Sequence, residues 1–232
     1  MLLILNTNSI YLFARFLLQH QISFPFKVKM SRIPSRFVFL LLVVISTSHS
    51  NAYPLSTHNR WIIDEATGQR AKLVCANWAG HLQPMIPEGL DKKSLKDIIG
   101  ELVKHKFNCV RLTYAIYMWT RYGHENVNAN FASLDVPEVV SKNNPFVLSM
   151  THLQAFDAVV HELGVQNVKV LLDNHVSEPM WCCDDNDENG FFHDRHFNPQ
   201  EWVHGLTLAA KHFSGNHVVC IFLSHFLAQL CS

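Results

Sequence analysis

Two observations predict an α/β protein with a parallel sheet and helices packed outside it. Three short apolar runs, at 72–78, 108–114 and 168–175, gain polar or aromatic residues toward their carboxyl ends. Such runs are typical of strands that are buried on both faces and open into a polar site. Each run precedes a stretch of helical periodicity, and this alternation implies right-handed crossovers in a parallel sheet. One edge of the sheet is therefore expected to carry the function.

The elements before the second strand are marked by turn and capping signals. A short hairpin is expected at 59–69, with its turn at Thr67 and Gly68, and it should close one end of the sheet. Ser94 and Asp97 form the pattern of a capping box at the start of the first helix. An apolar face at helical spacing follows and should cover the sheet: Leu95, Ile98, Ile99, Leu102 and Val103.

The second strand carries an arginine at a position that should face inward. Cys109, Arg111 and Thr113 share one face by alternation, while Val110 and Leu112 share the other and should face the helices. A buried arginine is costly without a partner. Two interpretations of Arg111 therefore stand, a structural ion pair and an active-site role.

The connection at 115–148 is long and is expected to form a cleft-lining loop. Thr151 and Gln154 then cap a second helix, for which Gly164 is the expected stop. That helix carries the apolar face Leu153, Phe156, Val159, Val160 and Leu163.

The third strand, 168–175, reads V-K-V-L-L-D-N-H and leads into a polar loop at 177–197. Asn198 and Pro199 mark the start of a third helix. A fourth strand is expected at 217–223. Four strands and three helices in alternation complete the predicted architecture.

Charge and the N-terminus limit the function classes. The first 63 residues contain six basic residues and no acidic residue. The rest of the chain therefore carries a net charge of about −6, although the whole chain is neutral. Nucleic acid is therefore not an expected partner. Arg32 and Arg36 precede an apolar run at 37–45, and small residues follow up to Ala52, as in a secretory signal.

A signal peptide normally begins a chain, so Met30 is the expected natural start. We expect an upstream extension at 1–29 and a signal peptide or uncleaved signal anchor at 30–52. The protein is then expected outside the cell or in the cell wall, with membrane contact only if the signal stays uncleaved.

The cysteines and the polar loop at 177–197 are the candidates for disulfides and for a metal site. Cys75 and Cys109 lie in predicted strands, where a buried small apolar side chain is expected. Cys182 and Cys183 are adjacent, and each is expected to bridge to a distant partner.

The loop from Asp185 to Gly190 matches the first half of a calcium loop, but His196 stands where its bidentate glutamate belongs. The cysteines and histidines of this region also lack zinc spacing. No metal or cofactor is expected.

Aromatic residues near the strand ends offer flat faces on which sugar rings could stack. Together with Arg111 and the D-N-H ending at His175, they favour an uncharged polyhydroxy ligand. These aromatic residues are Trp78, Trp119, Trp181, Phe191 and Phe192.

From about Trp61 to Val219 the chain resembles the plant branch of glycoside hydrolase family 5, the cellulase-like (β/α)8 barrels. The motifs that carry the resemblance are R-W-I-I-D-E-A-T-G-Q-R, N-W at Asn77, F-N-C-V-R-L-T-Y around Arg111, L-L-D-N-H ending at His175, W-C-C at Trp181 and N-G-F-F.

The resemblance implies a truncated barrel, with its N-terminal half at 53–219 and a divergent apolar tail at 220–232. It also implies hydrolysis of O-glycosyl bonds in β-linked polysaccharides, as by a cellulase, endoglucanase or mannanase, with a polysaccharide or oligosaccharide as substrate. The residues expected to bind substrate are Arg111, His175, Asn77, Trp78, His81 and Trp181.

One departure from the family pattern bears on activity. Where the family has an asparagine followed by the acid/base glutamate, this chain has His225 and Phe226. The second glutamate belongs to strand seven, beyond the four strands expected here. No catalytic residue is therefore assigned and an inactive form is expected. The alternatives are a non-catalytic carbohydrate-binding fragment and a mis-spliced product without function.

Overall fold

A computed structural model of the chain describes residues 54–224, apart from 134–139, 141, 183, 185 and 190. The expected upstream extension and signal lie outside these residues, as do His225 and Phe226. No helix in the described part is both long and apolar enough to cross a membrane.

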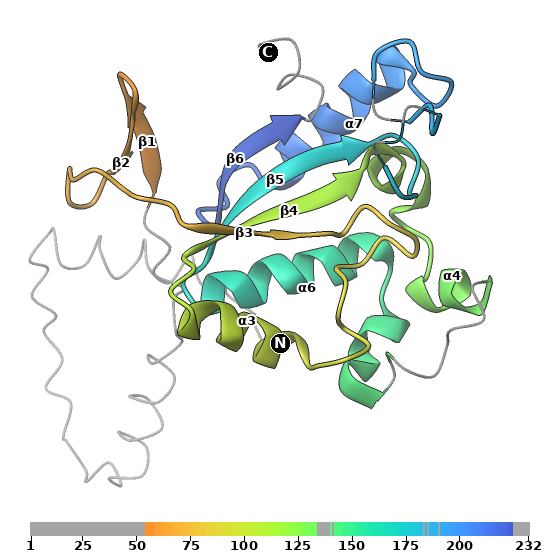
Figure 1. Cartoon of the computed structure of the whole chain (residues 1–232), viewed down its shortest axis with the longest axis horizontal. Helices are drawn as coiled ribbons and strands as arrows, with labels where there is room; N and C mark the ends of the chain where they lie inside the picture. The colour runs from red at the N-terminus through yellow and green to blue at the C-terminus, as the bar shows by residue number, and fades with distance from the viewer. Residues whose placement is uncertain are drawn as a thin grey trace, which may run out of the picture. The chain divides into compact units, whose positions relative to one another are not determined.

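Four parallel strands form the central sheet, in the order in which they follow one another along the chain (Figure 1). This confirms the predicted parallel sheet. In the register, Arg111 pairs with Asn77 on one side and Leu171 on the other. The last strand extends past the expected boundary of the divergent tail. The strands are β3 (Cys75–Trp78), β4 (Cys109–Ala115), β5 (Lys169–Val176) and β6 (Val219–Ser224).

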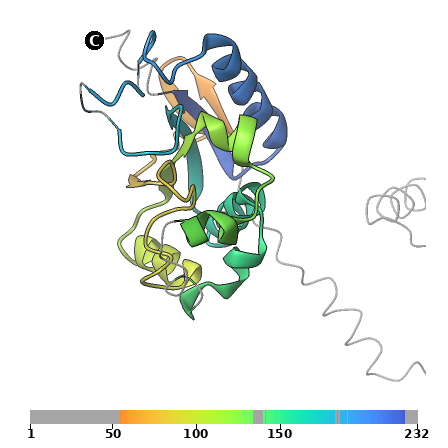
Figure 2. The ribbon, with the colours of Figure 1, turned by 90° about the vertical axis from the view of Figure 1, so that its right-hand side faces the viewer.

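The three predicted covering helices are present, and side chains cap each of them as expected. The Ser94 and Asn198 side chains accept the backbone N–H groups of the third residues in their helices, and Thr151 forms a complete capping box with Gln154. Figures 1 and 2 show α3 and α6 together on one face of the sheet. The helices are α3 (Leu95–Lys104), α6 (His152–Val165) and α7 (Pro199–His212).

Gly164 does not stop α6, contrary to the sequence-based expectation. The helix runs through it to Val165, and Asn167 then takes the left-handed conformation with φ of 59°. Gly164 serves packing, because a Cβ there would lie 2.5 Å from a methyl carbon of Val218. Glycine therefore allows α6 to approach the segment that enters β6.

The expectation of a plain loop at 115–148 is also wrong in part. The described residues of this connection form three short helical segments, because buried apolar side chains such as Met118, Val127 and Val147 anchor them to the core. The segments are the π-helix η1 (Met118–Tyr122), α4 (Val127–Ser133) and the 3-10 helix η2 (Pro145–Ser149).

The N-terminal hairpin turns earlier than expected. β1 (Leu55–His58) pairs with β2 (Trp61–Asp64), so the turn falls at Asn59 and Arg60. Asn59 has φ of 53°, a conformation that asparagine tolerates better than most residues. The expected turn near Gly68 exists as a second reversal, which brings Arg70 beside β2.

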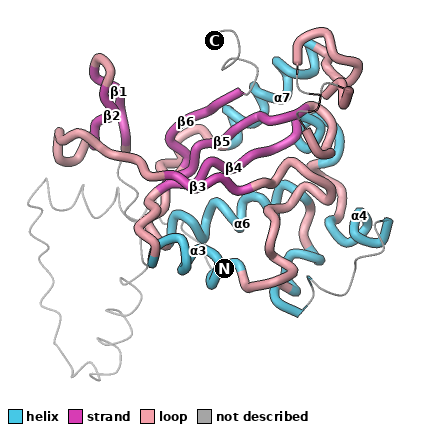
Figure 3. Tube along the Cα trace, viewed as in Figure 1, coloured by secondary structure: helices cyan, strands magenta, loops and turns pink. Residues whose placement is uncertain are grey.

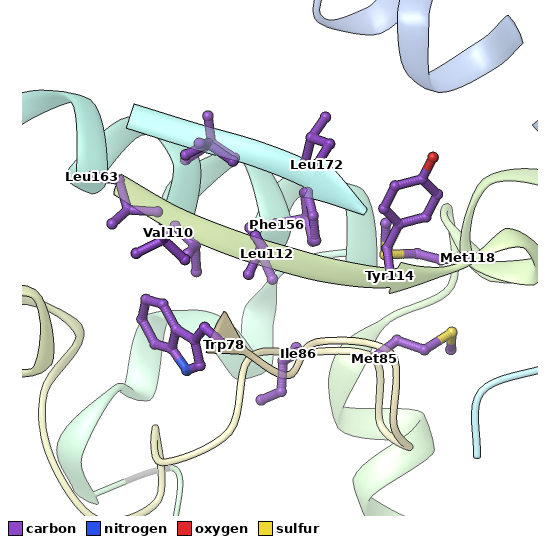
Figure 4. Packing of buried hydrophobic residues seen from close by; sticks show 14 of the residues in the cluster. Trp78, Met85, Ile86, Val110, Leu112, Tyr114, Met118, Phe156, Leu163 and Leu172 are labelled. Atoms are coloured by element: carbon purple, nitrogen blue, oxygen red, sulfur yellow. The ribbon is translucent and has the colours of Figure 1, made fainter. Parts of the chain in front are cut away.

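The core lies between the sheet and α6. Val110 and Leu112 of β4 and Leu172 of β5 point toward Phe156 and Leu163 of the helix, and each of these side chains is at most 1% exposed (Figure 4). This confirms the predicted helix-facing side of the second strand. Residues at alternate positions consequently lie on the other face of the sheet.

Cys75 and Cys109 form a disulfide, which corrects the expectation of two buried thiols. They are direct partners in the register of β3 and β4, with Cα atoms 4.2 Å apart. The bridge therefore fixes the edge strand β3 to its neighbour at the amino ends of both strands.

Candidate functional site

The candidate site lies at the carboxyl ends of the sheet strands. Figure 2 views this end of the sheet, and Figure 3 shows the loops after β3 and β5 running past it. In parallel sheets with helical crossovers, these ends and their loops form the usual position of a ligand site.

Asp173 is the centre of the site. Its Oδ2 atom lies 2.6 Å from the Arg111 guanidinium and 2.9 Å from Nδ1 of His175. The Asp173 side chain is 1% exposed and that of Arg111 is 26% exposed, so the pair is shielded on one side and open on the other. Arg111 thus forms an ion pair, which is one of the two interpretations that the sequence left open for it.

His175 is oriented by this carboxylate. Its Nδ1–H donates to Asp173, which fixes the ring and the position of that proton. The ring of His81 lies against that of His175, with centroids 4.5 Å apart. One polar group thus forms at the end of the sheet. It combines Arg111 of β4, Asp173 and His175 of β5, and His81 of the loop after β3.

Thr113 holds His81 in place, and sequence reasoning assigned it no role. Its hydroxyl shares a hydrogen bond of 2.8 Å with His81 Nδ1 and accepts the Gly80 N–H at 3.0 Å. Burial, and next the neighbouring His175, lower the pKa of His81 to about 4. The ring is therefore neutral near pH 6 and above and keeps one donor and one acceptor. Together, Arg111, Thr113, Asp173, His175 and His81 are called the Asp173 cluster below.

Of the other residues expected to bind substrate, Asn77 and Trp181 are exposed and Trp78 is buried. Asn77 is exposed and lies beside Arg111 in the register. Trp181 is 73% exposed in the loop after β5. Trp78 instead packs in the core at 9% exposure and donates its indole N–H to the Glu88 carbonyl. Trp119 is likewise a core residue, at 8% exposure.

The loop after β5 is held by hydrogen bonds that the sequence did not reveal. Asn189, 1% exposed, accepts the Glu178 N–H through Oδ1 at 2.8 Å and donates Nδ2–H to the Glu178 carbonyl at 2.9 Å. The Glu178 carboxylate pairs with His196 at 2.5 Å. Asn174, within the D-N-H sequence, turns away from the site and accepts the indole N–H of Trp202.

Among the described residues, one group of histidine and cysteine donors lies close together, and its cysteine is not a free ligand. His81, His175 and Cys182 have ligand atoms within 4.8 Å of one another, but Cys182 is in a disulfide and offers no thiolate. In the calcium-like segment, the Asp187 carboxylate accepts the backbone N–H groups of Asp184 and Asn189. Asp185, Cys183 and Gly190 lie outside the described residues.

No family model matches the chain. A glycosyl hydrolase 5 family protein from Chamaecyparis obtusa is 49% identical over 180 residues, which are 75% of this chain and 32% of the relative. An endoglucanase from Paenibacillus polymyxa is 26% identical over 121 residues, 51% of this chain and 27% of the relative. The chain therefore spans about a third of the length of the curated relatives it matches.

Two solved structures show the fold. The catalytic domain of the major endoglucanase from Xanthomonas campestris pv. campestris matches with a TM-score of 0.58 and 20% identity, over 74% of this chain and 44% of that one. An endocellulase from Pyrococcus horikoshii in complex with cellotetraose matches with a TM-score of 0.51 and 19% identity, over 68% and 38%. The four-stranded sheet is thus part of a (β/α)8 barrel. In sequence and in fold the chain is thus similar to glycoside hydrolase family 5, and it matches part of the length of the relative from that family.

Proposed function

We propose that the Asp173 cluster binds an oligosaccharide segment of a β-linked polysaccharide, such as a glucan or mannan, in a protein of the cellulase type. The observation that carries the proposal is the contact of Arg111 and His175 with one buried carboxylate at the carboxyl end of the sheet. The endoglucanase and cellotetraose-bound relatives support this substrate class.

The cluster offers hydrogen bonds suited to an uncharged sugar. Arg111 and Asp173 offset each other's charge, so neither attracts a strongly ionic ligand. The neutral His81 ring can donate or accept, and the remaining guanidinium N–H groups of Arg111 can donate to hydroxyls. Trp181, exposed beyond the cluster, provides a flat ring on which a sugar can stack.

We further propose that residues 1–232 bind this ligand without cleaving it. Retaining glycosidases need two carboxylates about 5–5.5 Å apart across the anomeric carbon. Among the described residues, the cluster contains one carboxylate, that of Asp173. Its Oδ2 atom contacts both the Arg111 guanidinium and the His175 ring. One carboxylate cannot serve both as the proton donor and as the nucleophile. The runner-up proposal is hydrolysis of the same ligand by a form of the protein that has the two catalytic glutamates of the family.

Two measurements on the purified full chain test these proposals. Titration calorimetry should detect binding of cellotetraose, and Arg111→Lys should weaken it at least tenfold by removing the guanidinium N–H groups that donate to the sugar hydroxyls. Incubation with aryl β-glucosides and soluble glucans should release no product. Absence of cellotetraose and mannotetraose binding would refute the binding role. Turnover that disappears in Asp173→Asn would show that Asp173 is catalytic.

We also propose export from the cell, on the signal pattern that precedes Ala52. Expression from Met30 in plant cells should yield a secreted product. Its N-terminal sequence should begin at Tyr53, and retention of residues 30–52 in a membrane fraction would favour the signal anchor.

A further inference from the structure

Three side chains of metal-binding types converge at the edge of the Asp173 cluster. His81, His175 and Cys182 each offer a ligand atom, and these atoms lie within 4.8 Å of one another. The ligands of a tetrahedral zinc ion, at about 2.0–2.1 Å for nitrogen and about 2.3 Å for sulfur, are separated from each other by about 3.3–3.6 Å. Small side-chain rotations would therefore bring the three atoms to the distances that zinc requires.

Both histidines are held by hydrogen bonds of the kind that orient metal ligands. His175 Nδ1–H donates to the Asp173 carboxylate at 2.9 Å. The Thr113 hydroxyl donates to the Trp78 carbonyl at 3.4 Å, so it can accept the Nδ1–H of His81 at 2.8 Å. In such an arrangement Nε2 of each ring is the atom that binds a metal, and the partner of Nδ1 fixes the ring and makes it a better ligand.

The oxidation state of Cys182 decides whether the site attracts a cation. Cys182 is in a disulfide and offers no thiolate. Arg111 lies 2.6 Å from the Asp173 carboxylate and 3.4 Å from the His175 ring, and its positive charge offsets that of the carboxylate. The two histidines therefore adjoin an ion pair without net charge. A Cys182 thiolate would add the negative charge and the soft sulfur ligand that zinc favours.

The site is also open enough for an ion to enter. His81 is buried, whereas His175 and Cys182 are each partly exposed. Trp181, the residue before Cys182, is 73% exposed. This open side leaves a fourth coordination position to water, as in other zinc sites that have three protein ligands.

We propose that His81, His175 and the thiolate of Cys182 bind a single Zn²⁺ ion once the disulfide of Cys182 has been reduced. A dithiol supplies the two electrons and two protons of the reduction and is itself oxidised to a disulfide, which leaves Cys182 and its former partner as thiols. Zinc then displaces the proton of the Cys182 thiol. The bound ion also excludes the sugar from the Asp173 cluster, a consequence that rests on the function proposed above.

The zinc affinity of the purified full chain, measured by competition with a chromophoric chelator, tests the site. The chain is compared before and after reduction with the phosphine TCEP. Reduced wild type should bind zinc at least about tenfold more tightly than the oxidised chain, because it gains a thiolate ligand. Cys182→Ser and His81→Gln should each cancel this gain. Cys220→Ser, which removes the free thiol of β6, is the matched control and should retain it.

Reduction can also open the Cys75–Cys109 bridge, and two measurements separate that effect. Cys182→His supplies a third nitrogen ligand without reduction, so the bridge stays closed. The oxidised variant should bind zinc at least about tenfold more tightly than oxidised wild type. With Co²⁺ in place of zinc, a thiolate-to-metal charge-transfer band should appear in reduced wild type and be absent from reduced Cys182→Ser, which keeps the thiols of Cys75 and Cys109.

The outcomes separate this inference from the proposed function. Equal zinc affinity of reduced wild type and reduced Cys182→Ser would overturn the metal site, as would an oxidised Cys182→His that binds zinc no more tightly than wild type. Zinc should weaken the binding of cellotetraose to the reduced chain at least about tenfold, and unchanged binding would overturn the exclusion of the sugar. A chain that binds zinc as expected but binds no cellotetraose or mannotetraose without zinc would refute the proposed function and support the metal site.

Discussion

At the scale of single residues, the site depends on how one buried carboxylate is neutralised. Asp173 is 1% exposed and relies on Arg111 and His175, whereas in a second arginine pair Arg121 is 44% exposed and Glu201 is 20% exposed. Arg121 contacts both oxygens of Glu201 at 2.7 Å, and Arg111 contacts one oxygen of Asp173 at 2.6 Å. The deeper burial of the Asp173 carboxylate should nevertheless make its partner the more important of the two arginines.

Replacement of Arg111 by alanine should lower the free energy of unfolding by about 3–5 kcal/mol, because it leaves the Asp173 charge buried with less compensation. Arg121→Ala should cost about 0–1 kcal/mol, as is usual for exposed pairs. Urea denaturation of both variants provides the comparison. Similar losses would show that the Asp173 pair is not the more important of the two.

Burial also separates the three tryptophans that the sequence places near strand ends. Trp78 and Trp119 stand near strand ends, as Trp181 does, yet of these three only Trp181 is exposed. Trp119 makes edge contacts with Tyr114 and Phe156 of the core. Position along a strand does not reveal which side of a loop a ring will occupy.

At the scale of the elements, close approach of β3 to β4 sets the position of His81. A Cβ on Gly80 would lie 2.8 Å from the backbone oxygen of Thr113, the residue that holds His81. Backbone cannot move aside as a flexible side chain can. The spacing of the two strands at this point therefore requires glycine.

Gly80→Ala should lower the free energy of unfolding by about 1–3 kcal/mol through overpacking. Gly100→Ala in α3 is the control, since its Cβ would lie 4.0 Å from the nearest atom outside the helix, Oε1 of Gln166, and alanine should stabilise the helix by up to about 1 kcal/mol. Thermal or urea unfolding measures both. Equal effects of the two changes would contradict the proposed contact.

At the scale of the whole molecule, two buried histidines couple stability to pH. Burial lowers the pKa of both His81 and His152 to about 4 in the folded chain, whereas an unfolded histidine titrates near pH 6.5. Between these values the unfolded state binds more protons. The free energy of unfolding should therefore fall as the pH falls from about 6.5 to 4, by up to about 3 kcal/mol for each histidine.

Replacement of His152 by glutamine removes one of these groups and should reduce the loss of stability between pH 7 and pH 4.5. Urea denaturation at the two pH values measures the loss, and His217→Gln, at an exposed position, serves as the control. The prediction fails if His152→Gln loses as much stability as wild type over this range.

The sequence by itself determined the alternation of strands and helices, the three helix caps and the inward face that carries Arg111. It also indicated that Arg111 needs a partner on that face. These features are local or periodic, because capping depends on residues three apart and the facing of a strand side chain depends on a period of two.

Only the tertiary structure decided the Cys75–Cys109 disulfide, the burial of Trp78, the role of Gly164 and the cavity beside Glu178. The disulfide joins residues 34 apart and depends on the register of two strands. The cavity is lined by Gln83, Tyr122, Asn130 and Glu178, which come from three separate regions of the chain. Such contacts depend on how elements pack against one another, and no local pattern of residues encodes that packing.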